Sequence, residues 1–411
     1  MEHISQLGTQ IQEKTANPEI LVISRFFRPA EAVIGEYVYN RCLQDPDRII
    51  MLAAGCSGDK IFDQAQKFPV YRWPNLHVCR GNLLGNILQP WLHIIGSLLI
   101  AIKLYFRYHY RYIEWCHGYD FPALLLLSYI LPIRFFIYLH GNDLLNVVRN
   151  PVWRSLFAFT LQRAEGIVCN NSYLRDALRQ SFRFDTPTHV INPVVRPEKF
   201  GHATSPSHLD DLRQRIRQIY NIPETAIVIL SVANLVTYKS IERVIDNIPL
   251  LLTVGVDVHY IICGEGDEQL HLKSKTERLR INDRVHFSGH VAERELAGYF
   301  AACDIFAQLN VWDRNNQDIY HFNLVYLEAG YFSKPVIASR TGSVLDVVRH
   351  EENGLLVNPE SGYEVFQTFN RLCQDQQLRE KLGRQGQELA KRRTYYRWLY
   401  EPESRSSCLL N

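Results

Sequence analysis

The sequence alternates short runs rich in β-branched and aromatic residues with longer helix-like stretches, and this alternation constrains the fold more than any other feature. In the first half, the strand-like runs are residues 19–27, 48–55, 111–118, 134–141 and 166–171. In the second half they are 226–234, followed by HYIICGEG, RVHFSGH, DIFAQLN, KPVIASR and NGLLVNP. Strands that alternate with helices favour a parallel sheet covered by helices. We therefore predict an α/β protein with two similar halves, whose ligands bind where the halves face each other across a cleft.

The length and composition support two globular domains. The chain has 411 residues, of which 46% are hydrophobic and 21% charged, which is typical of folded proteins and too long for one ordinary core. A polar segment, 201–222, is the expected linker between an N-terminal domain, 1–200, and a C-terminal domain, 223–385. We expect the charged, helix-like segment 386–411 to pack back on the first domain through its aromatic residues, with a frayed tail as the alternative.

Charge and cysteine usage exclude several classes of protein. A net charge of +2 provides no strong field that would attract nucleic acid. The nine cysteines are scattered without a CxxC pair, which argues against a zinc site or a disulfide framework and suits a reducing compartment. The polar segment 1–19 lacks the apolar core of a signal peptide. We therefore expect a cytoplasmic protein.

Two apolar stretches raise the question of a membrane. Segment 91–106 is interrupted by His93 and Lys103, and segment 123–139 by Pro132 and Arg134, so we expect neither to span a bilayer. The region 91–115, however, ends in interleaved basic and aromatic side chains. Such a surface suits a peripheral contact with the inner face of a membrane. The alternative is that arginine stems and tyrosines simply cover the domain surface.

In both halves, polar residues follow the predicted strands, where parallel α/β sheets bind ligands. Lys239 precedes a helix that begins near Ser240, so its ammonium group and the free helix amides suit a phosphate, although most such lysines are simply solvated. The turn GEGDE at 264–268 allows a close approach to a ligand but lacks full GxGxxG spacing, and a plain strand-to-helix turn is the alternative. His140 closes strand 134–141 and could hydrogen-bond a sugar hydroxyl, although a structural role is the commoner one for such a histidine.

Glu328 lies in the apolar helix-like run FNLVYLEAGYF, where a carboxylate must be exposed or paired because burial alone is costly. If the helix begins near Phe322, its free amides suit a diphosphate, and Glu328, two turns further on, can accept hydrogen bonds from ribose hydroxyls. Thr341 and Gly342 follow the next strand and could supply further backbone donors. These strand ends together predict a nucleotide-sugar site.

The succession VANLVTYKS, IICGEGDEQL, FNLVYLEAGYFSKPVIASRTGS and NGLLV resembles the donor domain of the retaining GT-B glycosyltransferases of family 4, which include phosphatidylinositol and lipid-precursor mannosyltransferases. The first half agrees more loosely, through YLHGND and VINPVVRPEKF. The resemblance implies two Rossmann-like domains facing each other across a cleft. It also implies transfer of a hexose from a nucleoside-diphosphate sugar, with GDP-mannose favoured, to a hydroxyl of a lipid or saccharide acceptor.

The resemblance assigns roles to individual residues. Lys239 would bind the donor diphosphate, Glu328 would bind the ribose as the second acid of the EX7E motif, and His140 would lie beside the transferred sugar. The catalytic residues would therefore be His140 and Lys239. The other positions that match the donor site are Asn234, Gly264, Tyr320, Phe322, Asn323, Leu324, Thr341, Gly342 and the following acid, Asp346.

Three positions depart from the family pattern. The first acid of EX7E falls at Tyr320, with Asp318 as the nearest substitute, and the phosphate-binding arginine falls at Asn234. The glycine pair of the first loop falls near Ala32 and Val33. These departures support an alternative, a catalytically eroded member that binds a sugar nucleotide or a protein partner. A sugar-nucleotide 2-epimerase shares the architecture, but we identify no acid/base set for it.

The implied mechanism requires no protein nucleophile. The acceptor attacks from the face that the diphosphate leaves, the leaving phosphate takes the proton, and Lys239 with helix amides stabilises the departing negative charge. No DxD-like carboxylate cluster stands out in the sequence, so we expect a metal-independent reaction with no cofactor beyond the nucleotide-sugar co-substrate.

Overall fold

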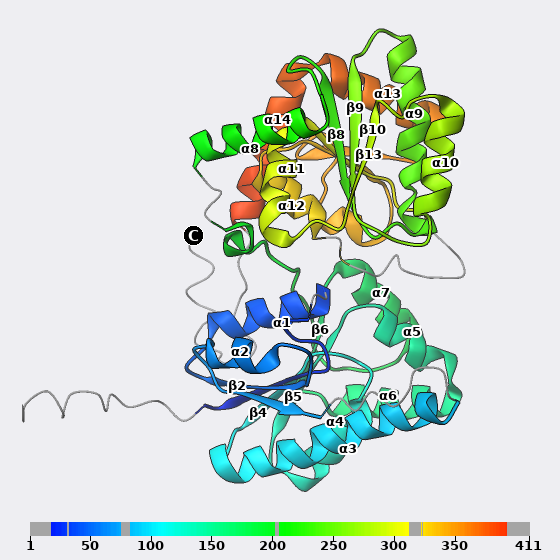
Figure 1. The fold of residues 1–411 in the computed structure, drawn as a ribbon. Coiled ribbons are helices and arrows are strands. Elements are labelled where there is room, and N and C mark those ends of the chain that lie inside the picture. The colour runs from blue at the N-terminus through cyan, green and yellow to red at the C-terminus, as the bar shows by residue number, and fades with distance from the viewer. Residues whose placement is uncertain are drawn as a thin grey trace, which may run out of the picture. The chain divides into compact units, whose positions relative to one another are not determined.

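The computed structural model of the chain describes residues 18–30, 33–74, 83–201, 205–311, 322 and 324–392. These residues divide into two compact units (Figure 1). The first unit holds the described residues of Met1–Asn170 and Leu174–Ile191, and the second holds those of Asn171–Tyr173 and Asn192–Thr394. Both units contain a parallel sheet with interleaved helices, so the predicted α/β class with two Rossmann-like domains is confirmed.

The first unit is built on a parallel sheet with strand order β3-β2-β1-β4-β5-β6-β7 in the described part of the chain. Its strands are β1 (Ile20–Ser24), β2 (Ile49–Ala54), β3 (Val70–Trp73), β4 (Tyr112–Trp115), β5 (Arg134–Leu139), β6 (Gly166–Cys169) and β7 (Thr188–Val190). Every residue of β1 and β2 is buried, because helices cover both faces of the sheet. This explains why these strands read as continuous apolar runs rather than as alternating patterns.

The helices of the first unit include one of 26 residues, α3, which packs against β2, β3 and α4. Trp73 Nε1 at the end of β3 donates a hydrogen bond of 2.9 Å to His93 Nδ1, which fixes α3 to the sheet. The helices are α1 (Val33–Gln44), α2 (Asp59–Gln64), α3 (Leu83–Tyr108), α4 (Phe121–Ile130), α5 (Asn142–Arg149), α6 (Pro151–Arg163) and α7 (Ser172–Ser181).

The second unit is built on a parallel sheet with strand order β10-β9-β8-β11-β12-β13 in the described residues. Its strands are β8 (Ile227–Val232), β9 (Val258–Cys263), β10 (Val285–Gly289), β11 (Ile305–Gln308), β12 (Val336–Ser339) and β13 (Gly354–Val357). The chain adds strands on one side of β8 and then, from β11, on the other. The sheet therefore has a topological switch point between β8 and β11, where ligands of such sheets bind.

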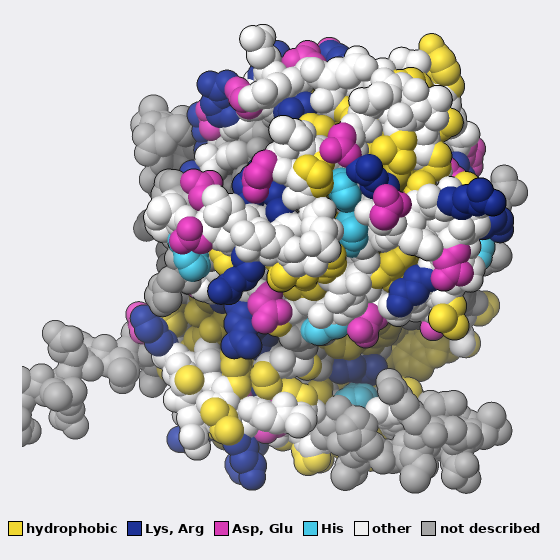
Figure 2. Space-filling model, turned by 45° about the horizontal axis from the view of Figure 1, so that its top comes forward, with side chains coloured by type: hydrophobic (Ala, Val, Ile, Leu, Met, Phe, Trp, Pro, Cys, Tyr) yellow, Lys and Arg dark blue, Asp and Glu magenta, His cyan; other side chains and the backbone are white. Residues whose placement is uncertain are grey.

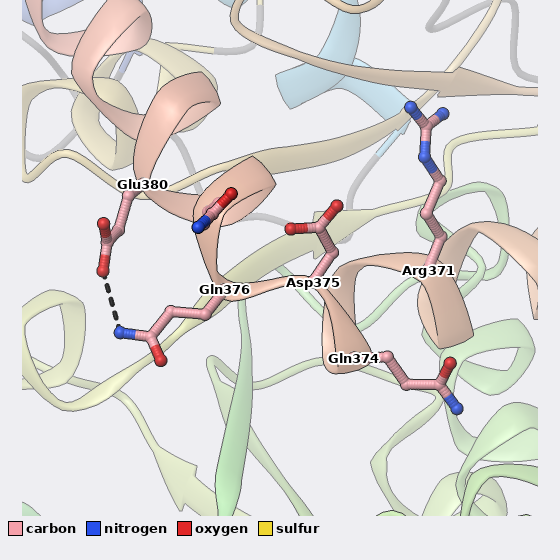
Figure 3. Close-up of a pocket in the computed structure, with 6 residues that line it drawn as sticks. Arg371, Gln374, Asp375, Gln376 and Glu380 are labelled. Carbon is pink, nitrogen blue, oxygen red and sulfur yellow. Dashed lines mark hydrogen bonds between the residues drawn. The ribbon is translucent and has the colours of Figure 1, made fainter.

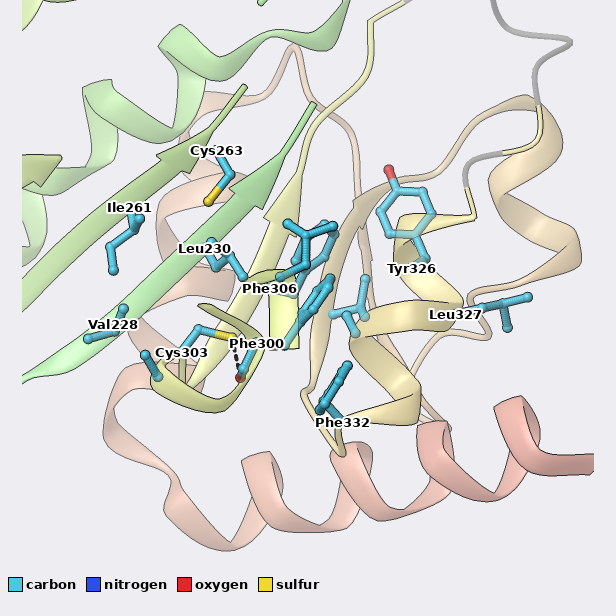
Figure 4. Packing of buried hydrophobic residues seen from close by; sticks show 14 of the residues in the cluster. Val228, Leu230, Ile261, Cys263, Phe300, Cys303, Phe306, Tyr326, Leu327 and Phe332 are labelled. Atoms are coloured by element: carbon cyan, nitrogen blue, oxygen red, sulfur yellow. Dashed lines mark hydrogen bonds between the residues drawn. The ribbon is translucent and has the colours of Figure 1, made fainter. Parts of the chain in front are cut away.

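Two hydrophobic clusters fill the faces of the second sheet, because alternate residues of each strand point to opposite sides. Val228 and Leu230 belong to one cluster, and Ile229 between them belongs to the other. Figure 4 shows the first cluster, in which side chains of β8, β9, α11, β11 and α12 gather on one face. The helices are α8 (Pro206–Ile219), α9 (Ile241–Thr253), α10 (Gln269–Leu279), α11 (Leu296–Ala302), α12 (Val325–Tyr331), α13 (Gly362–Gln374) and α14 (Gln376–Arg392).

The segment predicted as a linker, 201–222, is instead part of the second unit. Residues 206–219 form α8, which packs against α11 and places Leu209, Leu212 and Ile216 against the core. Arg217 on this helix is buried and donates to the carboxylate of Asp304 at 2.9 Å. The division between the units falls at Ile191 and Asn192, ahead of the predicted linker.

The described part of the C-terminal helix lies on the second unit. α14 packs on α12 of the second unit, where the side-chain amide of Gln387 donates to the Tyr331 carbonyl at 3.0 Å. Gly330 allows this close approach, since a Cβ there would lie 2.9 Å from the Gly386 carbonyl oxygen. Residues 386–392 therefore pack on the second unit. The aromatic residues expected to reach the first domain fall within 393–411, outside the described residues, so that part stays a prediction.

Candidate active site

The candidate site of the second unit lies at the switch point, where the loops after β8 and β11 meet. The amide of Val311, after β11, donates to the carbonyl of Tyr238, after β8, at 2.9 Å. The Tyr326 hydroxyl on α12 donates to the Gln308 carbonyl at the end of β11, also at 2.9 Å. These two bonds hold the loop that carries Lys239 and the helix that carries Glu328 around one strand end.

Lys239 lies at the entrance to α9, as predicted. It ends a short 3-10 helix, η2 (Thr237–Lys239), and the left-handed Ser240 then turns the chain into α9. The Lys239 side chain is half-buried, and its ammonium nitrogen lies 5.2 Å from the centroid of the Tyr238 ring. A cation–π contact of this kind holds the ammonium beside the helix entrance. Asn234, at the position of the family's arginine, is exposed after β8.

Gly264 has a local reason to be glycine. Its φ is +138°, and a Cβ there would lie 1.9 Å from the Ala233 carbonyl oxygen. The loops after β8 and β9 stay hydrogen-bonded beyond the strands, with the Leu235 amide donating to the Glu265 carbonyl at 2.9 Å. The turn 264–268 therefore serves the close packing of two loops, which matches the plainer of the two interpretations of this turn.

Glu328 is buried and forms an ion pair with Lys199 (Glu328 Oε1 with Lys199 Nζ). The side chains of Lys199 and Glu328 are only 6% and 4% exposed. This confirms the prediction that a carboxylate in this apolar run is exposed or paired. The second carboxylate oxygen, Oε2, accepts no hydrogen bond from the residues that the structure describes.

Lys199 was missed in the sequence, although it lies in the segment VINPVVRPEKF. It belongs to a short 3-10 helix, η1 (Pro197–Phe200), whose position is fixed by Phe200. The Phe200 ring packs edge-on against Phe332, with centroids 4.8 Å apart, and stacks near Tyr331 at 6.0 Å. The sequence signal that could have pointed to Lys199 is its place beside Phe200 in a short turn that begins with Pro197.

The start of α12 corrects the prediction for the phosphate-binding amides. The helix begins at Val325 rather than near Phe322, so Glu328 lies in its first turn rather than two turns along. Phe322 is buried in the core cluster and Leu324 is half-buried at the cap position. Asp318, Tyr320, Asn323 and Ala32 lie outside the described residues, and Val33 is the first residue of α1.

The loop after β12 has one of its predicted donors already occupied. The Thr341 amide donates to the Ser339 carbonyl at 2.9 Å, so it is not a free donor. Gly342, with φ of +55°, begins the 3-10 helix η5 (Gly342–Asp346). Asp346 accepts hydrogen bonds from the Ser172 amide at 2.6 Å and from Asn192 Nδ2 at 3.2 Å. The division of the chain assigns Asn171–Tyr173, and so the first two residues of α7, to the second unit together with Asp346 and Asn192. This acid is therefore a structural acceptor.

In the first unit, His140 follows β5, as predicted, and is buried with its ring 5.0 Å from the Tyr37 ring. Its backbone is held by Asp143, whose carboxylate accepts hydrogen bonds from four backbone amides. The donors are Gly118 at 2.9 Å, His140 at 3.1 Å, Gly141 at 2.8 Å and Leu144 at 3.0 Å. Asp143 therefore fixes the ends of β4 and β5, the neighbouring strands that lead to His117 and His140.

A second polar cluster at the same strand ends was also missed in the sequence. Arg25, after β1, forms a two-bond ion pair with Asp120, and Asp120 Oδ2 lies 3.8 Å from His117 Nε2. Burial raises the pKa of Asp120, while the Arg25 guanidinium opposes this shift. Burial lowers the pKa of His117 well below its usual value, with Arg25 adding to the effect, so His117 is neutral near pH 7.

Comparison with known proteins identifies the chain. The family model for glycosyl transferases group 1 matches residues 213–389, and the model for Glycosyltransferase Family 4 matches residues 57–199. The chain is a family 4 glycosyltransferase. The first match covers most of the second unit, including Lys239 and Glu328, and the second covers His140 and Lys199.

A curated relative of this glycosyltransferase is the GDP-mannose-dependent alpha-(1-6)-phosphatidylinositol monomannoside mannosyltransferase of Mycobacterium tuberculosis, which is 25% identical over 238 residues. This match spans 58% of the chain and 60% of the relative's length.

Solved structures show the fold of the glycosyltransferase. HepE of Anabaena, in complex with UDP and glucose, is 21% identical and matches with a TM-score of 0.71 over 95% of this chain and 99% of its own. Sucrose-phosphate synthase of Thermosynechococcus elongatus is 17% identical, with a TM-score of 0.72 over 96% of this chain and 98% of its own. The predicted GT-B fold is thus confirmed.

Two surface hollows of the glycosyltransferase lie away from the carboxyl ends of the strands. One lies at the junction of α13 and α14, where Gln376 Nε2 donates to Glu380 at 2.8 Å and Arg371 and Asp375 line the wall (Figure 3). The other is lined by His259 and His286, near the starts of β9 and β10. Figure 2 shows one face of the molecule, on which histidines lie between acidic and basic side chains. Among the described residues, no group of three or more His, Cys, Asp or Glu side chains is placed to hold a metal ion.

Proposed function

We propose that this glycosyltransferase moves a hexose from a nucleoside-diphosphate sugar to a hydroxyl of a lipid or saccharide acceptor, with retention of the anomeric configuration and without a metal ion. The observation that carries the proposal is the Glu328–Lys199 pair beside the switch point of the second unit. A buried carboxylate needs a reason to be retained, because replacing such a pair by apolar residues is often neutral or stabilising. A ligand that uses the carboxylate supplies that reason.

Glu328 is proposed to bind the donor ribose. Lys199 holds Oε1, which leaves Oε2 to accept hydrogen bonds from two adjacent hydroxyls. The Tyr326 bond to Gln308 fixes α12 against β11, so the acceptor oxygen keeps its place without a ligand. Preorganisation of this kind reduces the ordering cost of binding.

Lys239 is proposed to stabilise the departing diphosphate. Its ammonium group lies at the entrance to α9, whose first amides add partial positive charge. In the proposed reaction the acceptor hydroxyl attacks the anomeric carbon from the face that the diphosphate leaves. The bond to the diphosphate oxygen breaks, and that phosphate takes the proton. Loss of one preorganised donor in such a site slows the reaction by about 10²–10³, so Asn234 in place of arginine is expected to give a slow enzyme.

His140 is proposed to lie beside the transferred sugar. Burial and the Asp143-organised backbone give this histidine one fixed position. We favour GDP-mannose as donor because a curated relative is named as a GDP-mannose-dependent mannosyltransferase. UDP-glucose is the competing donor, because HepE was solved with UDP and glucose.

The proposal is tested by incubating the purified protein with GDP-mannose or UDP-glucose and measuring release of the nucleoside diphosphate, with and without candidate acceptors. Lys239→Ala is expected to reduce release by about a hundredfold or more. Lys273→Ala on α10, an exposed lysine away from the switch point, is the matched control and is expected to leave the rate unchanged. A donor that raises the melting temperature but is never cleaved would favour the eroded, binding-only alternative over catalysis.

A further inference from the structure

One side of α3 exposes large apolar side chains in a regular stripe. Trp91, Ile95, Leu99 and Phe106 are 50%, 49%, 60% and 70% exposed. At 3.6 residues per turn, these four positions fall within an arc of roughly 80° on the helix surface. The opposite side is buried against the sheet and holds Ile94, Ala101 and Leu104. The exposed stripe is therefore a second apolar face that the fold of the first unit leaves uncovered.

Two neighbouring helices extend this surface. α4 lies between α3 and α6 and contacts both. On α4, Leu126, Tyr129 and Ile130 are 47%, 59% and 57% exposed. The Tyr129 ring stacks near Phe159 of α6, with centroids 6.5 Å apart and planes within 10°. We call this surface the α3–α4–α6 face, and its apolar members are Trp91, Ile95, Leu99, Phe106, Leu126, Tyr129, Ile130, Val152 and Phe159.

The charge on these helices has one sign. Asp and Glu make up 43 of the 411 residues, yet α3, α4 and α6 contain none. The helices carry four exposed cations, Lys103 and Arg107 on α3 and Arg154 and Arg163 on α6. Arg107 stacks over Tyr71 of β3 and Arg154 donates to the Ser181 carbonyl, so Lys103 and Arg163 are the cations nearest the apolar stripe. The Arg163 guanidinium lies 4.1 Å from the centroid of the Tyr129 ring, which places a cation at the edge of the apolar surface. By contrast, the face in Figure 2 mixes acidic and basic side chains.

The geometry of α3 favours lying on a membrane over crossing one. Residues Gln89–Tyr108 are long and apolar enough to span a bilayer by length and composition, with a mean hydropathy of 1.2. However, the Trp73–His93 bond and the buried side of α3 attach this helix to the sheet. Insertion across the bilayer would expose that core, whereas partial insertion of the outer face would not. A helix with one apolar and one packed side binds in the interfacial plane.

We propose that the α3–α4–α6 face binds an anionic lipid surface, such as the cytoplasmic leaflet of a membrane. The apolar residues enter the headgroup boundary, Trp91 and Tyr129 take the interfacial positions that such rings prefer, and the cations contact lipid phosphates. The three helices carry cations and no acidic side chains, which is the charge that anionic headgroups attract. The proposal is independent of sugar transfer, since nucleotide release and membrane binding are measured separately.

The test is cosedimentation of the full chain with vesicles of phosphatidylcholine alone or mixed with phosphatidylglycerol. We expect binding to the anionic vesicles that weakens as salt is raised. Leu99→Ser/Phe106→Ser is expected to reduce partitioning more than tenfold, because two large apolar groups leave the interface. Lys103→Ser/Arg163→Ser is expected to reduce it by about fivefold per charge removed. Circular dichroism checks that the variants remain folded.

Ile61→Ser on α2 is the matched control, because Ile61 is 81% exposed but lies on a different helix of the same unit. It is expected to bind vesicles as the unchanged chain does. Failure of the unchanged chain to bind anionic vesicles would overturn the proposal, as would full binding by Leu99→Ser/Phe106→Ser. Self-association in solution that this variant abolishes, without any vesicle binding, would also overturn it and would assign the face to a second copy of the chain.

Discussion

Replacement of Lys199 by methionine tests whether the buried ion pair organises the second unit. Methionine has a similar length but no charge, so the change leaves the Glu328 carboxylate without its counterion. Both side chains are less than a tenth exposed (6% and 4%), and breaking a buried pair on one side costs about 3–5 kcal/mol. We expect Lys199→Met to lower the free energy of unfolding of the second unit by that amount.

The double variant Lys199→Met/Glu328→Met separates the pair from the charge it leaves behind. With both charges gone, no buried carboxylate is left unpaired, so we expect most of the lost stability to return. Arg371→Met is the control, because the Arg371–Glu351 pair, 2.8 Å apart, has side chains that are 50% and 55% exposed. Solvent screens an exposed pair, so its loss is expected to change stability little.

Native-state hydrogen exchange of the β8 and β11 amides is the suitable assay, because it reports on the second unit separately from the first. A loss for Lys199→Met no larger than that for Arg371→Met would refute the argument. Strict additivity of the Lys199 and Glu328 changes would refute it as well, because residues in direct contact should show a coupling energy of about 0.5–3 kcal/mol.

Three further predictions follow from the geometry. Gly264→Ala is expected to destabilise the second unit by more than about 3 kcal/mol in urea unfolding, because the new Cβ would lie 1.9 Å from the Ala233 carbonyl oxygen at a φ of +138°. Gly362→Ala is the control and should change stability little, because a Cβ there meets nothing within 4 Å. Asp143→Asn is expected to lower the melting temperature and kcat together, because an amide nitrogen replaces one oxygen facing four backbone donors; a lower melting temperature with unchanged kcat would contradict the positioning of His140. Burial, with His259 adding to the effect, lowers the pKa of His286 from 6.5 to about 4. The unfolded state therefore binds the proton first, and the free energy of unfolding should fall as pH drops from about 6.5 to 4. His286→Gln should flatten this dependence, measured as the urea midpoint against pH.

The architecture was predictable because it follows from local pattern. Buried parallel strands read as apolar runs such as IIMLAA at 49–54, and helices between them read as periodic stretches such as α9. Both signals depend on residues close in sequence, so composition and period suffice to recover them. The positions of His140 after β5 and Lys239 before α9 follow from the same local reasoning.

The linker prediction failed because polar composition concealed a helical pattern. Residues 206–219 are strongly charged, but Leu209, Leu212 and Ile216 recur at helical spacing and pack on the core. Counting the period rather than the polarity would have found α8. The helix start at Val325 was misplaced by a few residues, which is the usual uncertainty of a boundary without a clear cap.

The partner of Glu328 was not predictable from local sequence, because Lys199 lies 129 positions away. Sequence requires that a buried carboxylate be satisfied but does not say by which residue. The same holds for the cluster of Arg25, His117 and Asp120, which two segments far apart in sequence bring together at the ends of β1 and β4. Long-range pairing of this kind follows from strand order, and strand order follows from packing of the whole sheet.

Two buried carboxylates of the candidate sites, Asp143 and Glu328, differ in a way that separates structural from ligand-binding roles. Asp143 has both oxygens satisfied by backbone amides, Oδ2 by Gly118 and Oδ1 by Gly141 and Leu144, so it completes the fold by itself. Glu328 has Oε1 satisfied by Lys199, while Oε2 accepts nothing from the described residues. An acid with one oxygen that the described fold does not use can accept hydrogen bonds from a ligand through that oxygen. If Glu328 binds ribose, Glu328→Gln should raise the KM for the donor by more than tenfold, while a 2′,3′-dideoxyribose analogue should bind the unchanged enzyme and the variant equally. A variant that discriminates between donor and analogue as well as the unchanged enzyme does would show that Glu328 serves the fold alone.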